Sequence, residues 1–263
     1  MKTSFVILTW NRDSMLKICI EKLIKSIANK AESEIIIFNN NSTDSTVSVL
    51  NEFYLMNHNE INIKIVNHKK NLGLNAYKKL MRMATGDVII EVDDDVLEFP
   101  VGIDEIFESY LYTFKEFGFI SLDVIKNKHT NGAKPPEEKY IDITRDGKTI
   151  QYGPTGGWCA GFRAADYKKI SFLFERVIPL SFKRGEDAVL SKLFSIMGKK
   201  SGIIKDIRCL HATGPYYAKM FGSLERDIEK YDVAGIENMR DIYKKISVKM
   251  FKRLLIQAHL NYP

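Results

Sequence analysis

Apolar residues in the N-terminal part of the chain follow two alternating spacings. Short runs, of which residues 35–38 are the clearest, are apolar on both faces, as is typical of buried parallel strands. Between them, apolar residues recur every three or four positions, as on one face of a helix. This pattern predicts strands over residues 4–9, 34–38, 61–66 and 87–92, with helices over residues 13–27, 45–53 and 76–84. The β-α-β order predicts a parallel sheet with right-handed crossovers.

The pattern in the rest of the chain is more mixed. It predicts helices over residues 103–114 and 190–197, and strands over residues 119–125 and 203–207. Residues 127–138 include Pro135-Pro136 and predict a loop that is a candidate for disorder. From Leu224 onward the spacing is again helical.

Polar residues gather directly after three of the predicted strands. They are Asn11-Arg12, Asn39-Asn40-Asn41 and Asp93-Asp94-Asp95. Ligands of open α/β sheets bind at the carboxyl ends of the strands. We therefore expect a binding site at this edge of the sheet.

The three consecutive aspartates predict a metal site. Carboxylates this close repel one another, and a divalent cation that binds them relieves the repulsion. The alternative is an acidic turn that caps a helix. The chain contains neither a P-loop motif nor a Gly-x-Gly-x-x-Gly motif after the first strand, which argues against a P-loop ATPase and against a dinucleotide-binding fold.

Composition narrows the class of protein further. The chain has 263 residues, of which 45% are hydrophobic and 27% charged, as in a globular protein of one large or two small domains. Its three cysteines are far apart, which argues against a disulfide scaffold and a cysteine zinc site. Much of the net charge of +6 lies between Arg240 and Arg253 instead of spreading over a patch with aromatics, so we expect no nucleic-acid partner. No apolar stretch approaches a membrane span, and we expect a cytoplasmic protein.

An ordered set of motifs resembles glycosyltransferase family 2. The motifs of the nucleotide-sugar half are Leu8-Thr9-Trp10-Asn11-Arg12, Phe38–Asp44, Asn71-Leu72-Gly73, Ala84-Thr85-Gly86-Asp87 and Asp93-Asp94-Asp95. Those downstream are Gly156-Gly157-Trp158 through Phe162-Arg163, Gly185-Glu186-Asp187 and His211. They resemble the family's acceptor loop, its Glu-Asp motif and its late histidine.

The resemblance implies an α/β fold of the GT-A type, in which helices flank a Rossmann-like, mostly parallel central sheet. Residues 1–222 would form the glycosyltransferase domain, with 1–98 as the nucleotide-sugar-binding half and 99–222 as the acceptor-binding half. Residues 223–263 would add a C-terminal basic amphipathic helical segment.

The resemblance also implies an activity and a role for each motif residue. The activity is inverting, metal-dependent transfer of a sugar from a nucleotide-diphospho-sugar, with a UDP-sugar expected, to a hydroxyl of a glycan or lipid-linked glycan. Asp187 would be the general base, and Asp95 and His211 would bind Mn²⁺ or Mg²⁺. Acceptor binding falls to Gly157, Trp158 and Glu186. Donor binding falls to Thr9, Trp10, Asn11, Arg12, Asn39, Asn41, Asn71, Gly73, Asp93 and Asp94.

Each of these side chains also has a structural interpretation. Trp10 could be a core residue instead of a platform for the base, and Asn39 could form a turn. Glu186-Asp187 could be ordinary acidic residues at a helix N-terminus. His211 could be a buried structural histidine. Trp158, after two glycines, is interpreted as a platform for a sugar.

The chain departs from the family pattern at a few positions. Asn39 stands where an aspartate usually contacts the base, and Lys79 and Met81 stand where Asn and Gly are common. These departures leave the donor's base open.

The C-terminal segment has an apolar face and a basic face. Met239, Ile242, Tyr243, Ile246, Met250 and Leu254 form the first, and Arg240, Lys244, Lys245, Lys249 and Arg253 the second. Such a helix can lie on the inner face of a membrane as a peripheral contact, or pack on the domain with its basic face in solvent.

Two rival functions share some of these features. A sugar-phosphate nucleotidyltransferase would need a Gly-rich loop with Arg or Lys after the first strand, which Leu8–Arg12 lacks. A catalytically inactive sugar-binding module would not need Asp95, Asp187 and His211 together.

Overall fold

The computed structural model describes residues 2–183 and 185–245. Its contacts divide the chain into two compact units, residues 1–212 and residues 213–263. The second unit thus begins at Thr213, ahead of the boundary expected at residue 223, so the helix over residues 215–220 belongs to it.

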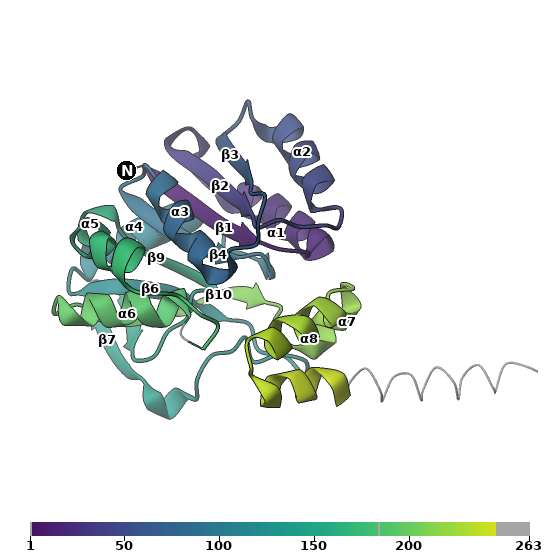
Figure 1. Ribbon diagram of the computed structural model, residues 1–263. Coiled ribbons are helices and arrows are strands. Elements are labelled where there is room, and N and C mark those ends of the chain that lie inside the picture. The colour runs from purple at the N-terminus through teal and green to yellow at the C-terminus, as the bar shows by residue number, and fades with distance from the viewer. Residues whose placement is uncertain (1, 184, 246–263) are drawn as a thin grey trace, which may run out of the picture. The chain divides into compact units, whose positions relative to one another are not determined.

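The first unit is built on a ten-stranded sheet with the order β3-β2-β1-β4-β9-β6-β10-β8-β7, in which β5 pairs with β10. Figure 1 labels the strands of this sheet except β5 and β8. The strands are β1 (Thr3–Thr9), β2 (Ser33–Asn39), β3 (Asn62–Asn67), β4 (Val88–Asp93), β5 (Val96–Glu98), β6 (Phe117–Val124), β7 (Ile141–Arg145), β8 (Lys148–Tyr152), β9 (Cys159–Arg163) and β10 (Lys200–His211). The helices are α1 (Asp13–Ser26), α2 (Thr46–Asn57), α3 (Ala76–Met83), α4 (Ile103–Thr113), α5 (Ala164–Phe172) and α6 (Glu186–Ile196).

Helices cover both faces of this sheet because alternate strand residues point to opposite sides. Phe5 and Ile7 of β1 belong to a core cluster that includes buried residues of α1, α2 and α4. Val6 belongs to a second cluster, with buried residues of α3, α5 and α6. The predicted α/β class with a mostly parallel central sheet flanked by helices is confirmed.

The pairing of the strands is parallel in the N-terminal half and mixed beyond it. β1 pairs in parallel with β2 and β4, and β2 with β3. β9 runs antiparallel to both β4 and β6, while β6 and β10 are parallel. The antiparallel β9 was not predicted, and neither were the hairpin β7–β8 and the short β5. β10 is also longer than the strand predicted over residues 203–207, and it extends to His211.

The loop over residues 127–138 is held in place, so the expectation of disorder is wrong. Lys134 is buried, and its Nζ lies 2.8 Å from Asp123 Oδ1 and donates to Gln151 Oε1 at 2.7 Å. The carbonyl oxygen of Gly132 accepts a hydrogen bond of 2.9 Å from His211 Nδ1. The loop therefore connects a buried ion pair to a residue of the predicted metal site.

The described part of the second unit, residues 213–245, is helical. It contains α7 (Pro215–Met220), α8 (Leu224–Val233) and a helix over residues 237–245. Tyr243 is buried in a cluster with Ala218 and Leu224, and Met239 packs against that cluster. The described residues 237–245 thus pack part of the predicted apolar face, Met239 and Tyr243, within this unit. Ile246, Lys249, Met250, Arg253 and Leu254 lie outside the described residues.

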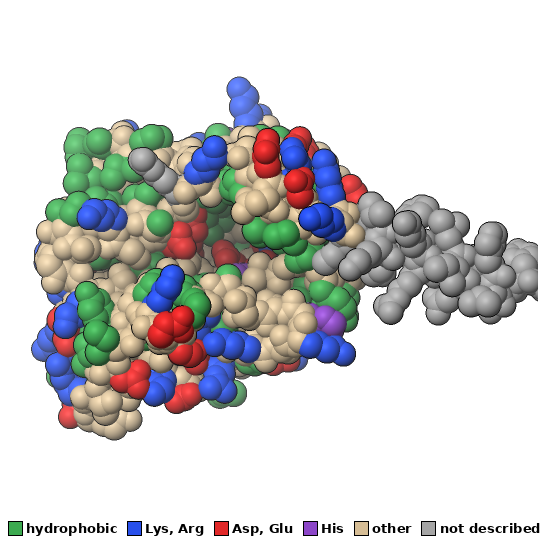
Figure 2. Space-filling model, turned by 90° about the horizontal axis from the view of Figure 1, so that it is seen from below, with side chains coloured by type: hydrophobic (Ala, Val, Ile, Leu, Met, Phe, Trp, Pro, Cys, Tyr) green, Lys and Arg blue, Asp and Glu red, His purple; other side chains and the backbone are tan. Residues whose placement is uncertain are grey.

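Basic and acidic side chains are interspersed on the face that Figure 2 shows, with no broad area of one sign. Among the helices of the described residues, none is long and apolar enough to cross a membrane.

Candidate active site

The carboxyl ends of β1, β2, β4 and β10 lie at one edge of the sheet. Their last residues are Thr9, Asn39, Asp93 and His211. The first three strands are parallel neighbours, and two antiparallel steps through β9 return β6 and β10 to the same direction. Because these four strands run in the same direction, the predicted polar residues at their carboxyl ends lie at one edge of the sheet.

Asp93, Asp95 and His211 form a group in which one possible ligand atom from each lies within 4.8 Å of the others. His211 Nε2 lies 3.3 Å from Asp95 Oδ1 and 3.6 Å from Asp93 Oδ2. The two carboxylates suit Mn²⁺ or Mg²⁺, and a neutral imidazole nitrogen is a common metal ligand beside them. The residues present thus fit a divalent cation, and Asp93 joins the two ligands that the sequence predicted.

The ring of His211 is oriented by two contacts. Nδ1 lies 2.9 Å from the carbonyl oxygen of Gly132, so Nε2 faces the aspartates and is the atom that a metal ion would bind after losing its proton. The indole of Trp158 stacks on the ring at a centroid distance of 5.8 Å. Burial lowers the pKa of His211, but the charges of Asp95 and Asp93 outweigh it and raise the pKa above its usual value.

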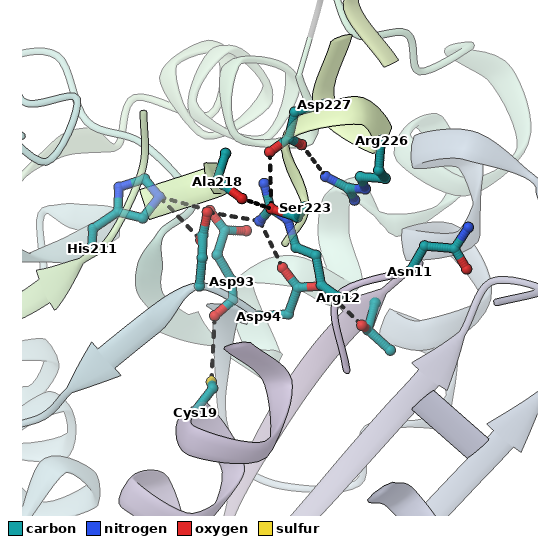
Figure 3. Close-up of polar contacts among 12 residues, drawn as sticks. Asn11, Arg12, Cys19, Asp93, Asp94, His211, Ala218, Ser223, Arg226 and Asp227 are labelled. Atoms are coloured by element: carbon teal, nitrogen blue, oxygen red, sulfur yellow. Dashed lines mark hydrogen bonds and ion pairs between the residues drawn. The ribbon is translucent and has the colours of Figure 1, made fainter. Parts of the chain in front are cut away.

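Arg12 and His211 reach the aspartates from opposite sides (Figure 3). Arg12 Nη1 lies 2.9 Å from Asp94 Oδ1 and 2.7 Å from Asp95 Oδ2. Thr9 Oγ1 donates to Asp94 Oδ2 at 2.8 Å. The guanidinium offsets part of the local negative charge. Burial, followed by the charge of Asp95, still raises the pKa of Asp93 to about 6.

The predicted donor-binding asparagines mainly shape the backbone. Asn39 is buried, donates from Nδ2 to Asn67 Oδ1 at 2.9 Å, and accepts from the Ser42 amide at 3.0 Å. These contacts favour the turn-forming interpretation of Asn39. Asn11 and Asn41 have positive φ angles of 49° and 66°, which asparagine tolerates better than most residues.

A second asparagine pair holds the next loop. Asn40 was not singled out from the sequence, yet its Nδ2 donates to Asn71 Oδ1 at 2.9 Å and its Oδ1 accepts from the Leu72 amide at 2.8 Å. Asn71 Oδ1 also accepts from the amide of Gly73, whose φ is +54°.

Trp10 is half-buried and is not among the buried core residues, which argues against its core interpretation.

The segment Gly156-Gly157-Trp158 lies against the aspartates. The carbonyl oxygen of Trp158 accepts from the Asp93 amide at 2.9 Å, and its indole donates to the carbonyl of Leu122 at 3.0 Å. Only 4% of Trp158 is exposed. The expected open sugar platform is therefore not what this indole offers; it packs in the core and orients His211.

Glu186 and Asp187 are the first residues of α6. Asp187 is half-buried, and its Oδ1 accepts from the Ala188 amide at 2.6 Å. Burial raises its pKa, and the backbone amides of Ala188 and Gly157 oppose that rise. Glu186 is buried, and burial together with the charge of Asp187 raises its pKa to about 8.

Glu91 is a buried acid of the site that the sequence analysis missed. It is fully buried on β4, and burial and the charge of Glu186 raise its pKa well above the usual range. A Cβ on Gly157 would lie 2.7 Å from Glu91 Oε1 and 3.2 Å from Glu186 Oε1, so both carboxyls flank this glycine. A glutamate within the apolar run of residues 88–92 was the available signal.

Comparison with known proteins identifies the fold and the family of this chain. The fold is of the GT-A type. A model of glycosyl transferase family 2 matches residues 4–171, and the chain belongs to this family. The chain is 24% identical over 212 residues to a poly(ribitol-phosphate) beta-glucosyltransferase of Bacillus spizizenii, a match that covers 78% of this chain and 31% of that protein.

A second relative is archaeal. It is a dolichyl N-acetyl-alpha-D-glucosaminyl phosphate 3-beta-D-2,3-diacetamido-2,3-dideoxy-beta-D-glucuronosyltransferase of Methanococcus voltae. It is 33% identical over 87 residues, which are 33% of this chain and 27% of that protein. The chain thus spans about a third or less of the length of these two relatives.

Two solved structures show the same fold. One is a mannosyltransferase from Pyrobaculum calidifontis in complex with GDP-Man and Mn²⁺, with a TM-score of 0.63, 14% identity, and coverage of 87% of this chain and 61% of that one. The other is S. aureus TarS 1–349, with a TM-score of 0.62, 16% identity, and coverage of 84% of this chain and 63% of that one.

Proposed function

We propose that the protein is an inverting glycosyltransferase that moves a sugar from a nucleotide-diphospho-sugar to a hydroxyl of a glycan or lipid-linked glycan. The observation that carries the proposal is the group of Asp93, Asp95 and His211 at the sheet edge where α/β proteins bind ligands. Family membership supports the reaction class. The identity of the donor as a UDP-sugar is the finer part of the proposal.

The three-residue group would hold Mn²⁺ or Mg²⁺. When bound, the cation neutralises the charge of the diphosphate leaving group. Arg12 remains beside the aspartates and adds a fixed positive charge to the same place. The mannosyltransferase complex with GDP-Man and Mn²⁺, and complexes of TarS with UDP and with UDP-GlcNAc, support a nucleotide-sugar donor for a chain of this fold.

Recognition of the donor is assigned to the loops after β1 and β2. Trp10 offers an indole face on which a nucleobase can stack. The asparagine contacts between residues 39–41 and residues 67–73 hold these loops in shape, so they act on the donor mainly through the backbone. Asp94 is assigned to the ribose hydroxyls of the donor. Its oxygens already accept from Thr9 and Arg12, and each can accept a further hydrogen bond from a hydroxyl.

Asp187 is assigned as the base that takes the proton of the acceptor hydroxyl. Two backbone amides orient its carboxylate, and its raised pKa makes it a stronger base than an exposed aspartate. Burial and the charge of Asp187 raise the pKa of Glu186 to about 8, which favours its neutral form and limits the negative charge beside the base. A single base and direct displacement invert the anomeric centre.

Asp187→Asn tests this assignment. The two side chains are nearly isosteric, so the dissociation constant of the donor should stay within a few-fold of wild type, while the rate of transfer falls by about 10²–10⁴-fold. The matched control is Asp146→Asn, in an exposed turn outside the site, which should leave the rate unchanged. The product's anomeric configuration, read by NMR, should be opposite to that of the donor.

Three results would contradict the proposal. An Asp187→Asn variant with normal turnover would move the base elsewhere, with Glu186 as the next position to test. A product that retains the donor's configuration would exclude single displacement. Release of pyrophosphate from a nucleoside triphosphate and a sugar phosphate, without sugar transfer, would identify a nucleotidyltransferase.

A further inference from the structure

The acidic side chains of the segment over residues 164–183 are buried or paired with basic side chains. It contains two acids, Asp166 and Glu175. Asp166 is buried and pairs with Arg163 at 2.7 Å and Lys169 at 3.3 Å. Glu175 pairs with Arg82 and accepts a hydrogen bond from the Tyr167 hydroxyl at 2.9 Å. The outer surface of this segment therefore carries no free carboxylate.

The same outer surface combines basic and large apolar side chains. Phe172 is 70% exposed, Val177 55% and Leu173 42%, and they lie at the end of α5 and in the π-helical turn η4 (Leu173–Val177). Lys168, Arg176 and Lys183 are exposed. We call Lys168, Phe172, Leu173, Arg176 and Val177, which lie on α5 and η4, the basic-apolar surface. Lys168, Phe172 and Arg176 follow one another at intervals of four residues, a spacing that places helical side chains on one face.

We propose that the basic-apolar surface docks the protein on an anionic lipid membrane. Apolar side chains enter the boundary between headgroups and acyl chains, and neighbouring lysines and arginines attract anionic headgroups. The absence of free carboxylates from this surface removes the repulsion that would oppose such binding. The inference goes beyond the proposed function, because vesicle binding requires neither donor nor turnover.

Helix α2 shows that exposed apolar residues alone do not make such a surface. Leu55 is 70% exposed and Met56 71%, so they match Phe172 in exposure. Yet α2 contains no lysine or arginine, and its acid, Glu52, is exposed and pairs with Lys17 at 3.3 Å. The exposed apolar residues of α2 thus lack the basic neighbours within their own helix that Phe172 and Leu173 have.

The position of this surface along the chain connects it with the site. Lys183 precedes Asp187 by four residues. Leu180, between the surface and the base, is buried, and its backbone exchanges two hydrogen bonds with the Asn75 side chain, at 3.2 and 3.3 Å. Glu175 in η4 pairs with Arg82 in the last turn of α3, and Leu180 contacts Asn75 just before α3, so residues 175–180 run along α3 from the basic-apolar surface toward the start of α6, which carries the base.

Vesicle sedimentation with the full-length chain tests the proposal. The vesicles contain phosphatidylcholine alone or with phosphatidylglycerol. We expect binding only to the anionic vesicles, with an affinity that falls as salt is added. Lys168→Gln/Arg176→Gln should weaken binding about fivefold for each basic residue removed. Phe172→Ser/Leu173→Ser should abolish most of the binding, while the matched variant Leu55→Ser/Met56→Ser binds as wild type does.

Activity separates this proposal from the function. Phe172→Ser/Leu173→Ser should transfer sugar to a soluble acceptor at the wild-type rate, so a failure of docking and a failure of transfer are distinguishable. The proposal is overturned if the wild-type chain ignores anionic vesicles, or if both serine variants lose binding equally. It is also overturned if Lys249→Gln/Lys252→Gln alone abolishes binding, because the C-terminal segment would then bind the membrane. A Phe172→Ser/Leu173→Ser variant that changes only from dimer to monomer would likewise overturn it, because the surface would then bind a second copy of the chain.

Discussion

Lys134→Met removes the charge that anchors the loop over residues 127–138. The Lys134 side chain is 2% exposed, and its Nζ contacts Asp123 Oδ1 at 2.8 Å and Gln151 Oε1 at 2.7 Å. Methionine has a similar length and apolar stem but no positive charge. The substitution therefore leaves Asp123 buried without its closest cation.

The size of the effect follows from this burial. Removing one partner of a buried ion pair costs about 3–5 kcal/mol. Arg208 Nε still lies 3.4 Å from Asp123 Oδ2, so we expect the lower end of that range, about 3 kcal/mol. For a chain of this length, such a loss lowers the melting temperature by roughly 6–12 °C.

The same substitution should also weaken metal binding. The carbonyl that orients His211 belongs to Gly132, two residues before Lys134. Loss of a contact that orients a metal-ligating histidine typically reduces metal affinity about 10–100-fold. Titration with Mn²⁺, with the free ion followed by electron paramagnetic resonance, measures this second effect independently of stability.

Two further variants decide whether the ion pair is the cause. Lys126→Met removes an exposed pair with Glu137, whose side chains are 45% and 55% exposed, and it should cost less than about 1 kcal/mol. Lys134→Met/Asp123→Leu should recover part of the lost stability, because no unpaired buried charge remains. If Lys134→Met unfolds in urea at the wild-type midpoint, the reasoning about the loop is refuted.

Three other substitutions test separate parts of the site. The pKa of Glu186, about 8 when folded, exceeds its usual 4.5, so the folded chain retains a proton that the unfolded chain releases, and stability should fall as pH rises from 4.5 to 8. Glu186→Gln should flatten that dependence in urea unfolding; parallel curves for variant and wild type would contradict it. Gly157→Ala puts a Cβ 2.7 Å from Glu91 Oε1 and should cost about 1–3 kcal/mol, read as a lower melting temperature. Trp10→Ala should weaken nucleotide binding by about 1–3 kcal/mol in calorimetry. An unchanged affinity with a collapsed melting temperature would make Trp10 a core residue.

The N-terminal half of the fold was predictable because its signals are local. Each strand and helix there carries its own hydrophobic period. The consecutive strands β1, β2 and β3 are neighbours in the sheet, and β4 pairs with β1 on its other side. The strand ends then define the edge where Thr9, Asn39 and Asp93 lie. These steps require no knowledge of distant contacts.

The features that were missed depend on pairing between distant segments. β9 inserts between β4 and β6, and nothing within residues 159–163 indicates an antiparallel partner on each side. The loop over residues 127–138 looks polar and rich in turns, but its order comes from Lys134 finding Asp123 and Gln151 across the sheet. A short motif shows the type of a side chain, not whether that side chain will be buried.

Trp158 shows how the same limit applies to the site. Two glycines before an indole suggested an open surface for a sugar, but the fold turns the ring inward onto His211. Asn39 was likewise assigned to the base, and the fold engages its amide with Asn67 and Ser42. Both residues lie at the predicted site, but the side chains that they contact could not be predicted from the sequence near them.

The segment Gly156-Gly157-Trp158 holds the two halves of the site together. On one side, the carbonyl and indole of Trp158 contact Asp93 and His211. On the other side, Gly157 lies against Glu186, and its amide opposes the rise that burial causes in the pKa of Asp187. A shift of this segment would therefore move the metal ligands and the proposed base together. Glycine at position 157 permits this close approach, because any side chain there would meet the buried carboxyls of Glu91 and Glu186.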